Sequence, residues 1–342
     1  MNLQTVTVAL LVVTTLVRGA PPQFDHGVDL LTTRPLIVAH RGSSGRLPEA
    51  TKEAFELAID EGADVIECDV TITRDLQLIC SHESWLTPTT NIADVFPEDR
   101  MNTYFVIDKA SQITDYFSVD FTLEELREIR VKQRNSRRDP NFDELFGITT
   151  LEEYIEIAQR SARPIGIYPE TKDPTWTNSL DILKDANTTF EDILLDVLTS
   201  HGYTEPNHPC FIQSFNENSI RYMSERTRLP LISLGVTSAV PEDRLDELAE
   251  FCYGIGPSKS AIVLTDASGN ILTRTDLIDR AHARGLRVHP FTMRNEYSYL
   301  PWDYGQDPAE EYLDFLKLGA DGLFTDFPST YYNFLNASYT EC

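Results

Sequence analysis

Short apolar runs alternate with longer amphipathic segments along most of the chain. The short runs have the length of buried strands, and the segments between them repeat apolar residues every three to four positions, as amphipathic helices do. One helix is predicted over 48–63, and another over 150–159 begins with the capping-box pair Thr150 and Glu153. The nine predicted strands are 35–42, 64–72, 76–83, 163–172, 210–215, 230–236, 252–257, 286–292 and 321–327.

The second and third predicted strands are separated only by a short turn around Arg74 and Asp75. A parallel crossover needs about a dozen residues or more, so these two strands must form an antiparallel hairpin. With the returning strand set aside, eight strand–helix units remain, and they predict an α/β protein with a (β/α)8 TIM barrel. A doubly wound open sheet is the alternative, but the sequence has no glycine-rich dinucleotide motif or P-loop to support it.

Residues 85–148 do not fit the strand–helix repeat. They include a predicted helix over 122–129 and a basic stretch, RVKQRNSRRD, over 130–139. An insertion of this length beside a barrel mouth is typical of a lid or a substrate-recognition element, although it could only brace the rim. The basic stretch taken alone is most often a solvated loop. We predict one catalytic domain over 35–335, with this insertion after the second-strand hairpin.

Polar side chains stand at the carboxyl ends of the predicted strands, where (β/α)8 barrels build their active sites. One polar residue at such a position usually lies on the rim or caps the following helix. Several on separate strands predict a shared site. They are His40, Arg41, Glu67, Asp69, His82, Glu170, Lys172, Gln213, His289 and Asp326.

Three of these residues suggest a metal site. Glu67 and Asp69 are two positions apart on one strand, so their side chains face the same side of the sheet. Two carboxylates this close raise a pKa or share a cation, and Glu170 ends the next barrel strand. Three carboxylates favour a hard divalent cation, Ca²⁺ or Mg²⁺. No His-x-x-x-His or Cys-x-x-Cys pattern argues for zinc.

The hairpin brings a histidine toward these carboxylates. If its turn centres between residues 74 and 75, Glu67 lies opposite His82, and directly opposed residues share a face. The same register turns Cys68 away from the cavity and Cys80 toward it, which argues against a Cys68–Cys80 disulfide unless a bulge intervenes. Strand proximity makes Cys68–Cys80 and Cys210–Cys252 the first candidate pairs, and the alternative is that all five cysteines are unpaired.

The remaining polar groups match the needs of phosphodiester cleavage. His40 and His82 form a candidate general acid–base pair. Arg41 could bind a phosphate through its guanidinium fork, and Lys172 could add a point charge. In such a site the cations neutralise the transition state, one imidazole activates the nucleophile and the other protonates the leaving alkoxide.

Several motifs together resemble a known family. AHRGSSGRLPEAT followed by GADVIECDVTITRDLQLICSH is similar to the opening signature of the glycerophosphodiester phosphodiesterases. Five later stretches resemble the bacterial periplasmic type of this family: GIYPETKDP, FIQSF, GIGP, VHPFTMR and GLFTDFP. The resemblance runs over about 35–335. It implies a phospholipase-C-like (β/α)8 barrel that hydrolyses glycerophosphodiesters, such as glycerophosphocholine, to sn-glycerol 3-phosphate and an alcohol.

The resemblance also implies roles for individual residues. His40 and His82 match the catalytic histidines, and Arg41 matches the phosphate-binding arginine. Phe215 and Phe291 match apolar positions near the glycerol or alcohol pocket. Glu67, Asp69 and Glu170 match the metal ligands of the family, for which Ca²⁺ is typical in the periplasmic type. Lys172 matches the lysine that follows the third ligand.

One position departs from the family pattern. The family usually has His-Asp where this chain has His82-Glu83, which lengthens the acidic side chain by one methylene. If Glu83 only orients the loop, activity should persist. If it contacts the imidazole directly, the rate could fall.

Two other functions are compatible with the same scaffold. One is a phosphodiesterase of the lysophospholipase D or sphingomyelinase D kind, and the other is a non-catalytic binding protein. The chain has 29 Lys and Arg against 54 Asp and Glu, a formal net charge of −25. Such a surface repels nucleic acid and anionic lipid. The partner that the resemblance implies is a small molecule, the glycerophosphodiester substrate. The sequence indicates no oligomeric state.

The N-terminus suggests secretion. An apolar run over 6–17 is too short to span a bilayer and is followed by Gly19 and Ala20, so residues 1–20 read as a signal peptide. The alternative is that this segment stays uncleaved as an N-terminal membrane anchor. For the chain after residue 20, no stable membrane insertion is predicted. Glycosylation sequons at Asn187 and Asn336 fit a secreted protein.

Overall fold

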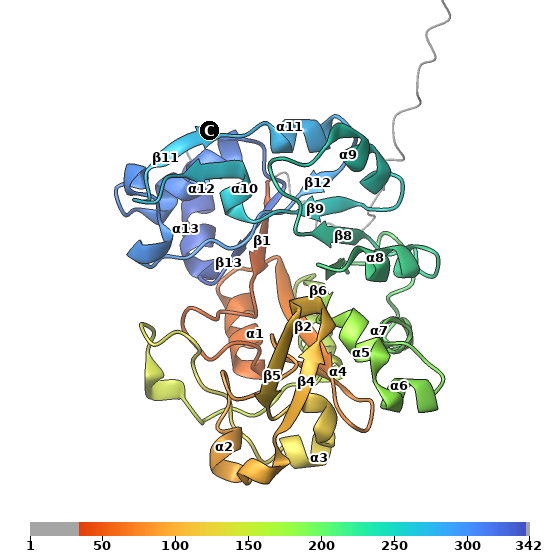
Figure 1. Cartoon of the computed structure of the whole chain (residues 1–342). Coiled ribbons are helices and arrows are strands. Elements are labelled where there is room, and N and C mark those ends of the chain that lie inside the picture. Colours follow the sequence, from red (N-terminus) through yellow and green to blue (C-terminus); the bar gives the residue numbers. More distant parts are fainter. Residues whose placement is uncertain (1–33, 340–342) are drawn as a thin grey trace, which may run out of the picture.

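A barrel of parallel strands forms the centre of the protein. The computed structural model describes residues 34–339 (Figure 1). Around the barrel the strand order is β13-β1-β2-β6-β7-β8-β9-β12. After β12, hydrogen bonds from Asp321 N to Val288 O (3.0 Å) and from Phe324 N to Pro290 O (3.1 Å) nearly close the ring. The strands are β1 Leu36–Ala39, β2 Val65–Ile72, β6 Gly166–Thr171, β7 Ile212–Ser214, β8 Leu231–Leu234, β9 Gly254–Gly256, β12 Arg287–Val288 and β13 Gly322–Thr325. The predicted (β/α)8 barrel is confirmed, and the open-sheet alternative is wrong.

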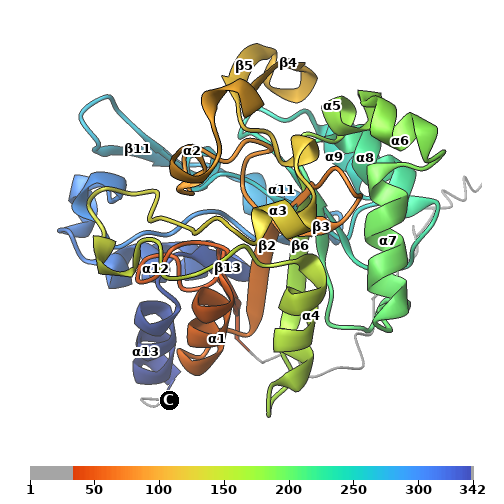
Figure 2. The ribbon, with the colours of Figure 1, turned by 90° about the horizontal axis from the view of Figure 1, so that it is seen from below.

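Helices surround the barrel, and Figure 2 shows α13, α1, α4 and α7 standing along its outside. The capping box of Thr150 and Glu153 is formed at the start of α4, as predicted. The helix predicted over 48–63 begins only at Lys52, because the Thr51 side chain caps it by accepting a hydrogen bond from Ala54 N. The longer helices are α1 Lys52–Asp60, α4 Leu151–Arg160, α7 Phe190–Ser200, α8 Glu217–Ser224, α9 Glu242–Leu248, α12 Pro308–Lys317 and α13 Pro328–Tyr339, and the shorter ones are α5 Pro174–Ser179, α6 Asp181–Asp185, α10 Lys259–Ile262 and α11 Leu277–His282.

Strand alternation separates two apolar layers. Val38, Val65 and Tyr168 pack together inside the barrel with Phe324. Their neighbours along the strands, among them Ile66, pack instead in the larger core that includes the helices. Because side chains alternate along a strand, Glu67 and Asp69 lie on the same side as Val65, toward the barrel interior.

The second-strand hairpin differs from the predicted register by one residue. The return strand β3 (Leu78–Cys80) pairs with β2 so that Val70 is opposite Cys80. The turn contains three residues, 74–76, with Leu76 in the left-handed region at φ +61°. A shift of one residue moves every side chain to the other face. The prediction that Glu67 lies opposite His82 is therefore wrong.

The corrected register explains the cysteines. Cys68 and Cys80 share the outward face of the hairpin and form a disulfide with a Cα–Cα distance of 5.7 Å. The expected Cys210–Cys252 pair is wrong, because both are buried free thiols. They precede β7 and β9, and β8 lies between these strands. Two strand spacings, about 9.5 Å, exceed the Cα separation that a disulfide spans. Cys342 lies outside the described residues.

The insertion over 85–148 has its own small core and occupies the bottom of Figure 1. Leu86, Phe121 and Ile148 pack there against Ile79 of β3, which ties the insertion to the barrel. The helix predicted over 122–129 is the short α3, with Thr122 and Glu125 as its capping box. The insertion also contains an unpredicted hairpin of β4 (Asn102–Val106) and β5 (Ser111–Asp115). The α-helices of the insertion are α2 Ile92–Val95 and α3 Leu123–Leu126.

A second unpredicted hairpin follows β9. It joins β10 (Val263–Thr265) and β11 (Ile271–Arg274), which pair as antiparallel strands. The helix α11 begins at Leu277.

Three predictions concern the termini and the surface. The signal peptide predicted over 1–20 lies outside the described residues, so secretion stays a prediction. Both sequon asparagines, Asn187 and Asn336, are exposed. Among residues 34–339, no helix combines the length and apolar character needed to cross a membrane.

Candidate active site

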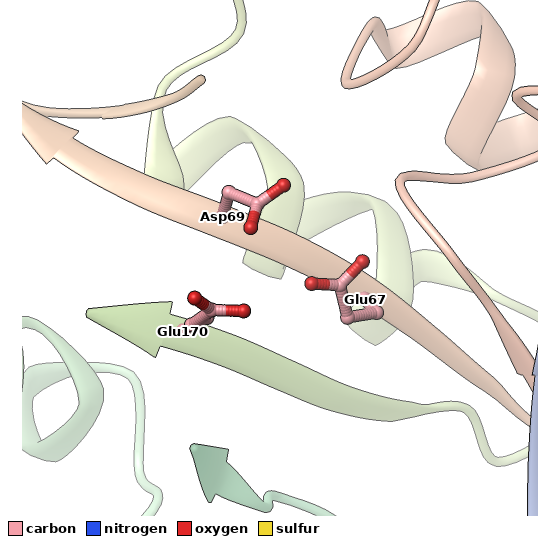
Figure 3. A group of neighbouring side chains, drawn as sticks. All are labelled: Glu67, Asp69 and Glu170. Carbon is pink, nitrogen blue, oxygen red and sulfur yellow. The ribbon is translucent and has the colours of Figure 1, made fainter. Parts of the chain in front are cut away.

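Three carboxylates converge at the carboxyl ends of β2 and β6. Asp69 and Glu170 are directly paired residues of these neighbouring parallel strands, and Glu67 lies one strand repeat earlier. Figure 3 shows the three side chains pointing toward one another from the two strands. One oxygen atom from each residue lies within 4.8 Å of the others, and all three residues are buried. The structure therefore brings together the predicted ligand set.

These carboxylates have the character of a cation site. Burial raises the pKa of Glu67, and the neighbouring charges of Asp69 and Glu170 raise it further. Asp69 Oδ2 is buried without a hydrogen bond among the described residues, although Arg41 Nε lies 2.9 Å away at an unfavourable angle. An ionised oxygen with free lone pairs, beside two more carboxylates, suits a hard divalent cation. Glu67, Asp69 and Glu170 would hold such an ion.

Two cationic side chains border the carboxylates. Arg41 donates its backbone N–H to Glu67 Oε2 (2.8 Å) and its Nη1 to Glu49 Oε1 (3.0 Å). Lys172 Nζ donates to Glu170 Oε1 at 2.7 Å and lies 3.4 Å from Asp69 Oδ1. Burial by itself would raise the pKa of Asp69, but Arg41 and Lys172 hold it well below its ordinary value. Burial outweighs Lys172 at Glu170 and raises the pKa of that carboxyl to about 7.

His40 follows β1 and is held by an acidic partner. Its Nδ1 lies 2.6 Å from Asp326 Oδ1, directly after β13. Burial and the positive charge of Arg41 lower the pKa of His40, although Asp326 opposes them. The pKa of Asp326 is held well below its ordinary value by His40 and by two arginines, despite its burial. An ionised carboxylate only accepts, so Nδ1 carries the proton and Nε2 keeps its lone pair.

His82 has the same arrangement. Its Nδ1 lies 2.6 Å from Glu83 Oε1, so the residue that departs from the family pattern contacts the imidazole directly. Burial and the charge of Arg41 lower the pKa of His82 to about 4. Burial would raise the pKa of Glu83, but hydrogen bonds from His82 and Arg134 lower it to about 2. Both imidazoles are therefore neutral at neutral pH, with Nε2 free to accept a proton.

These residues surround a pocket of about 370 Å³. Phe215 and Phe291 form one wall with ring centroids 5.8 Å apart, and Lys172 Nζ lies 5.7 Å from the Phe215 ring. Phe215 is 55% exposed and stands at the mouth. The lining includes most of the site residues predicted from the sequence, although Asp69, His289 and Asp326 are not among them: His40, Arg41, Glu67, His82, Glu170, Lys172, Gln213, Phe215 and Phe291.

Comparisons with known proteins agree with this geometry. The family described as the glycerophosphoryl diester phosphodiesterase family matches residues 40–330. A glycerophosphodiester phosphodiesterase of Arabidopsis thaliana, GDPD6, is 41% identical over 327 residues, which cover 89% of this chain and 87% of that protein.

The chain belongs to the glycerophosphoryl diester phosphodiesterase family.

Other family members extend the comparison. A glycerophosphodiester phosphodiesterase of Haemophilus influenzae is 26% identical, over 98% of this chain and 99% of that protein. The fold matches an Oleispira antarctica phosphodiesterase in complex with the product sn-glycerol-3-phosphate, with a TM-score of 0.61 and 20% identity, over 89% of this chain and 98% of that one. The similarity to the bacterial periplasmic type in particular stays a prediction.

Two strand-end residues predicted for the shared site lie elsewhere in this phosphodiesterase fold. Asp326 stands behind His40 rather than in the pocket that holds the carboxylates. His289 is buried in the barrel interior, where its Nδ1 lies 3.1 Å from the Tyr168 hydroxyl. Gln213 does line the pocket and donates from Nε2 to Glu67 Oε1 at 3.2 Å.

Four charged residues of the site were not predicted as site residues. Glu49 and Arg294 lie in two of the stretches that carry the family resemblance, AHRGSSGRLPEAT and VHPFTMR, but no role was predicted for either residue. Arg134 and Arg138 lie in the basic stretch of the insertion, whose charge stands out against an acidic chain. For these two arginines that contrast was the only sequence signal, and it did not indicate where the side chains point.

The buried histidine outside the pocket predicts acid sensitivity. Burial lowers the pKa of His289 to about 4 from an ordinary value of 6.5. Between pH 6.5 and 4, His289 binds a proton in the unfolded chain but not in the native state. The free energy of unfolding therefore falls as the pH drops from 6.5 toward 4. Between about pH 7.5 and 5, the free energy of unfolding should fall by about 2 kcal/mol more in the wild type than in His289→Gln. Urea titrations at both pH values check this, and equal losses in the two proteins would contradict it.

Proposed function

We propose that this protein is a metal-dependent glycerophosphodiester phosphodiesterase that releases sn-glycerol 3-phosphate and an alcohol. The observation that carries the proposal is the convergence of two carboxylate-paired histidines, two cations and three carboxylates on one pocket. Family membership and the product-bound relative from Oleispira antarctica support the same substrate class. Ca²⁺ is the proposed ion, with Mg²⁺ as the alternative.

The residues of the pocket divide the chemistry among them. Arg41 and Lys172 attract the phosphate and counter its charge as it builds up in the transition state. One imidazole accepts at Nε2 the proton of an attacking water as its oxygen bonds to phosphorus. The other imidazole takes up a proton from solvent, which the negative charge of the bound phosphate favours, and gives it to the leaving alkoxide as the P–O bond breaks. The Nδ1 partners, Asp326 and Glu83, hold the rings in the required tautomer and stabilise the imidazolium. A divalent cation held by Glu67, Asp69 and Glu170 would neutralise phosphate charge.

Substrate comparison separates this activity from the alternatives. Most side chains that line the pocket are charged or hydrogen-bonding, which favours a polar, water-soluble diester over a lysophospholipid. We expect kcat/KM to be higher for glycerophosphocholine than for lysophosphatidylcholine, measured as sn-glycerol 3-phosphate and choline release. The reverse preference would favour the lysophospholipase D alternative. If the protein hydrolyses neither of these compounds, and neither glycerophosphoethanolamine nor glycerophosphoinositol, the result would favour a non-catalytic binding protein.

The N-terminal apolar run supports the further proposal that the enzyme is secreted. The exposed positions of Asn187 and Asn336 are compatible with glycosylation at both sequons. Edman sequencing of the protein purified from culture medium would locate the mature N-terminus, and a start at the original methionine would contradict cleavage.

A further inference from the structure

Two arginines of the inserted basic stretch reach into the active site. Arg134 donates from Nη1 to Glu83 Oε1 at 2.9 Å and from Nη2 to Glu83 Oε2 at 2.5 Å. Arg138 donates from Nη2 to Asp326 Oδ2 at 2.5 Å. These guanidinium groups are paired with the half-buried Glu83 and the buried Asp326, in contrast to the solvated loop expected from the sequence.

The two carboxylates that these arginines hold are the partners of the two pocket histidines. Glu83 accepts from Arg134 and contacts His82 Nδ1, while Asp326 accepts from Arg138 and contacts His40 Nδ1. Each histidine thus begins a chain of imidazole, carboxylate and guanidinium. Both chains end on one segment, 134–138, although the two carboxylates are far apart in the sequence.

The segment is attached firmly enough to act as a fixed support. Gln133 Nε2 donates to Ser44 O (3.2 Å) and Leu47 O (3.3 Å), in the loop after β1. Lys132 N donates to Thr89 O (2.7 Å), inside the insertion. Arg138 Nη1 adds a bond to Ser44 O at 2.9 Å. The segment therefore joins the insertion to the strand end that carries His40.

We propose that Arg134 and Arg138 are positioning residues, through which the insertion fixes the carboxylates that orient both histidines. A carboxylate held on both sides cannot rotate away from the imidazole, and its charge stays available to the Nδ1 proton. Partners of this kind contribute about 10- to 100-fold to activity at sites where they orient a histidine ligand. The Arg138–Asp326 pair is shielded from water, with side chains 7% and 2% exposed, whereas in the Arg134–Glu83 pair the side chains are 29% and 13% exposed.

The two arginines should not be equivalent. Asp326 Oδ2 also accepts from Arg294 Nε at 2.7 Å, so it keeps a cationic partner when Arg138 is removed. The Glu83 carboxylate accepts hydrogen bonds from one arginine among the described residues, Arg134, which donates to both of its oxygens. Loss of Arg134 should therefore affect His82 more than loss of Arg138 affects His40.

Arg134 also contacts Glu49, which in turn pairs with Arg41, so a second route to the site exists. The two routes differ in the kinetic constant that they change. Disturbance of Arg41 weakens phosphate binding and raises KM, whereas a misoriented His82 lowers kcat. A double-mutant cycle with Glu83→Gln separates them further, because residues that act through one another have non-additive effects.

The test uses the full-length protein and rests on the proposed function for its kinetic arm. We expect Arg134→Gln to lower kcat on glycerophosphocholine about 10- to 100-fold with little change in KM, and Arg138→Gln to lower it less. Arg134→Lys, which keeps the charge but loses the planar fork, should recover part of the loss. Arg137→Gln is the matched control, because Arg137 is exposed and contacts Ser298 and the Tyr297 ring outside the pocket.

A second readout does not depend on turnover. Spectra of the protein labelled with ¹⁵N-histidine should show one fixed Nδ1–H tautomer of His82 in the wild type and in Arg137→Gln, and a mixture in Arg134→Gln. Wild-type kcat and an unchanged tautomer in Arg134→Gln would overturn the inference, as would additive effects of Arg134→Gln and Glu83→Gln. An inactive wild type would refute the proposed function alone, since the tautomer measurement would still decide the positioning role.

Discussion

His82→Ala and His40→Ala each lose most of the turnover of glycerophosphocholine, with kcat lower by about 10²- to 10⁴-fold, the range that a positioned acid–base group supplies. Each histidine presents an Nε2 with a free lone pair to the pocket, whereas the nearby carboxylates of Glu67, Asp69 and Glu170 are the proposed ligands of a divalent cation. Substrate binding should change less than kcat, since Arg41 and Lys172 remain. Initial rates of sn-glycerol 3-phosphate release give both constants.

A matched control separates chemistry from folding. His201 lies beyond the pocket, at the end of α7, where its ring nitrogen contacts Val197 O at 2.9 Å. His201→Ala should keep wild-type kcat, and all three variants should unfold cooperatively at similar temperatures. Near wild-type turnover in either pocket variant would refute the assignment of the acid–base pair.

Chelation should remove activity, and added calcium should restore it. The three buried carboxylates repel one another, so a bound divalent cation stabilises the native state as well as supporting catalysis. At a free calcium concentration of 100 times Kd, the stabilisation amounts to about 2.7 kcal/mol. Thermal unfolding with EDTA and with calcium measures this without reference to turnover, and magnesium in place of calcium tests the alternative ion.

Glu170→Gln tests whether the effect arises at the proposed site. This variant keeps the shape of the side chain but removes one of the three charges, so it should lose the calcium-dependent rise in unfolding temperature. Glu191→Gln is the control, because Glu191 is a buried carboxylate of α7 that accepts from Asn178 Nδ2 at 2.8 Å. Full activity in EDTA, or an equal calcium response in Glu170→Gln, would contradict the metal assignment.

Much of the site could be predicted because a parallel barrel gathers its strand ends. His40, Glu67 and Glu170 belong to different strands, yet the carboxyl ends of parallel strands meet on one face whatever the details of packing. Alternation along a single strand also decided that Glu67 and Asp69 point the same way. These inferences needed only local periodicity and the direction of the chain.

The hairpin shows where local reasoning stops. Whether its turn holds two or three residues depends on the left-handed backbone at Leu76, a conformation that the leucine itself does not indicate. That one residue reversed the facing of Cys80 and made the disulfide with Cys68 feasible. His82 still reaches the pocket, but it does so after β3 has ended at Cys80 rather than by standing opposite Glu67.

The sequence by itself determined the eight strand–helix units and the residues at the strand ends, because each follows from periodicities within one segment. Only the tertiary structure decided which side chains support the histidines. Arg134 and Arg138 meet Glu83 and Asp326 across large separations in the chain, and these ion pairs form only once the insertion has packed against the barrel. The sequence shows a basic stretch that contains these arginines. Their ion-pair partners depend on how segments that are distant in the sequence pack against one another.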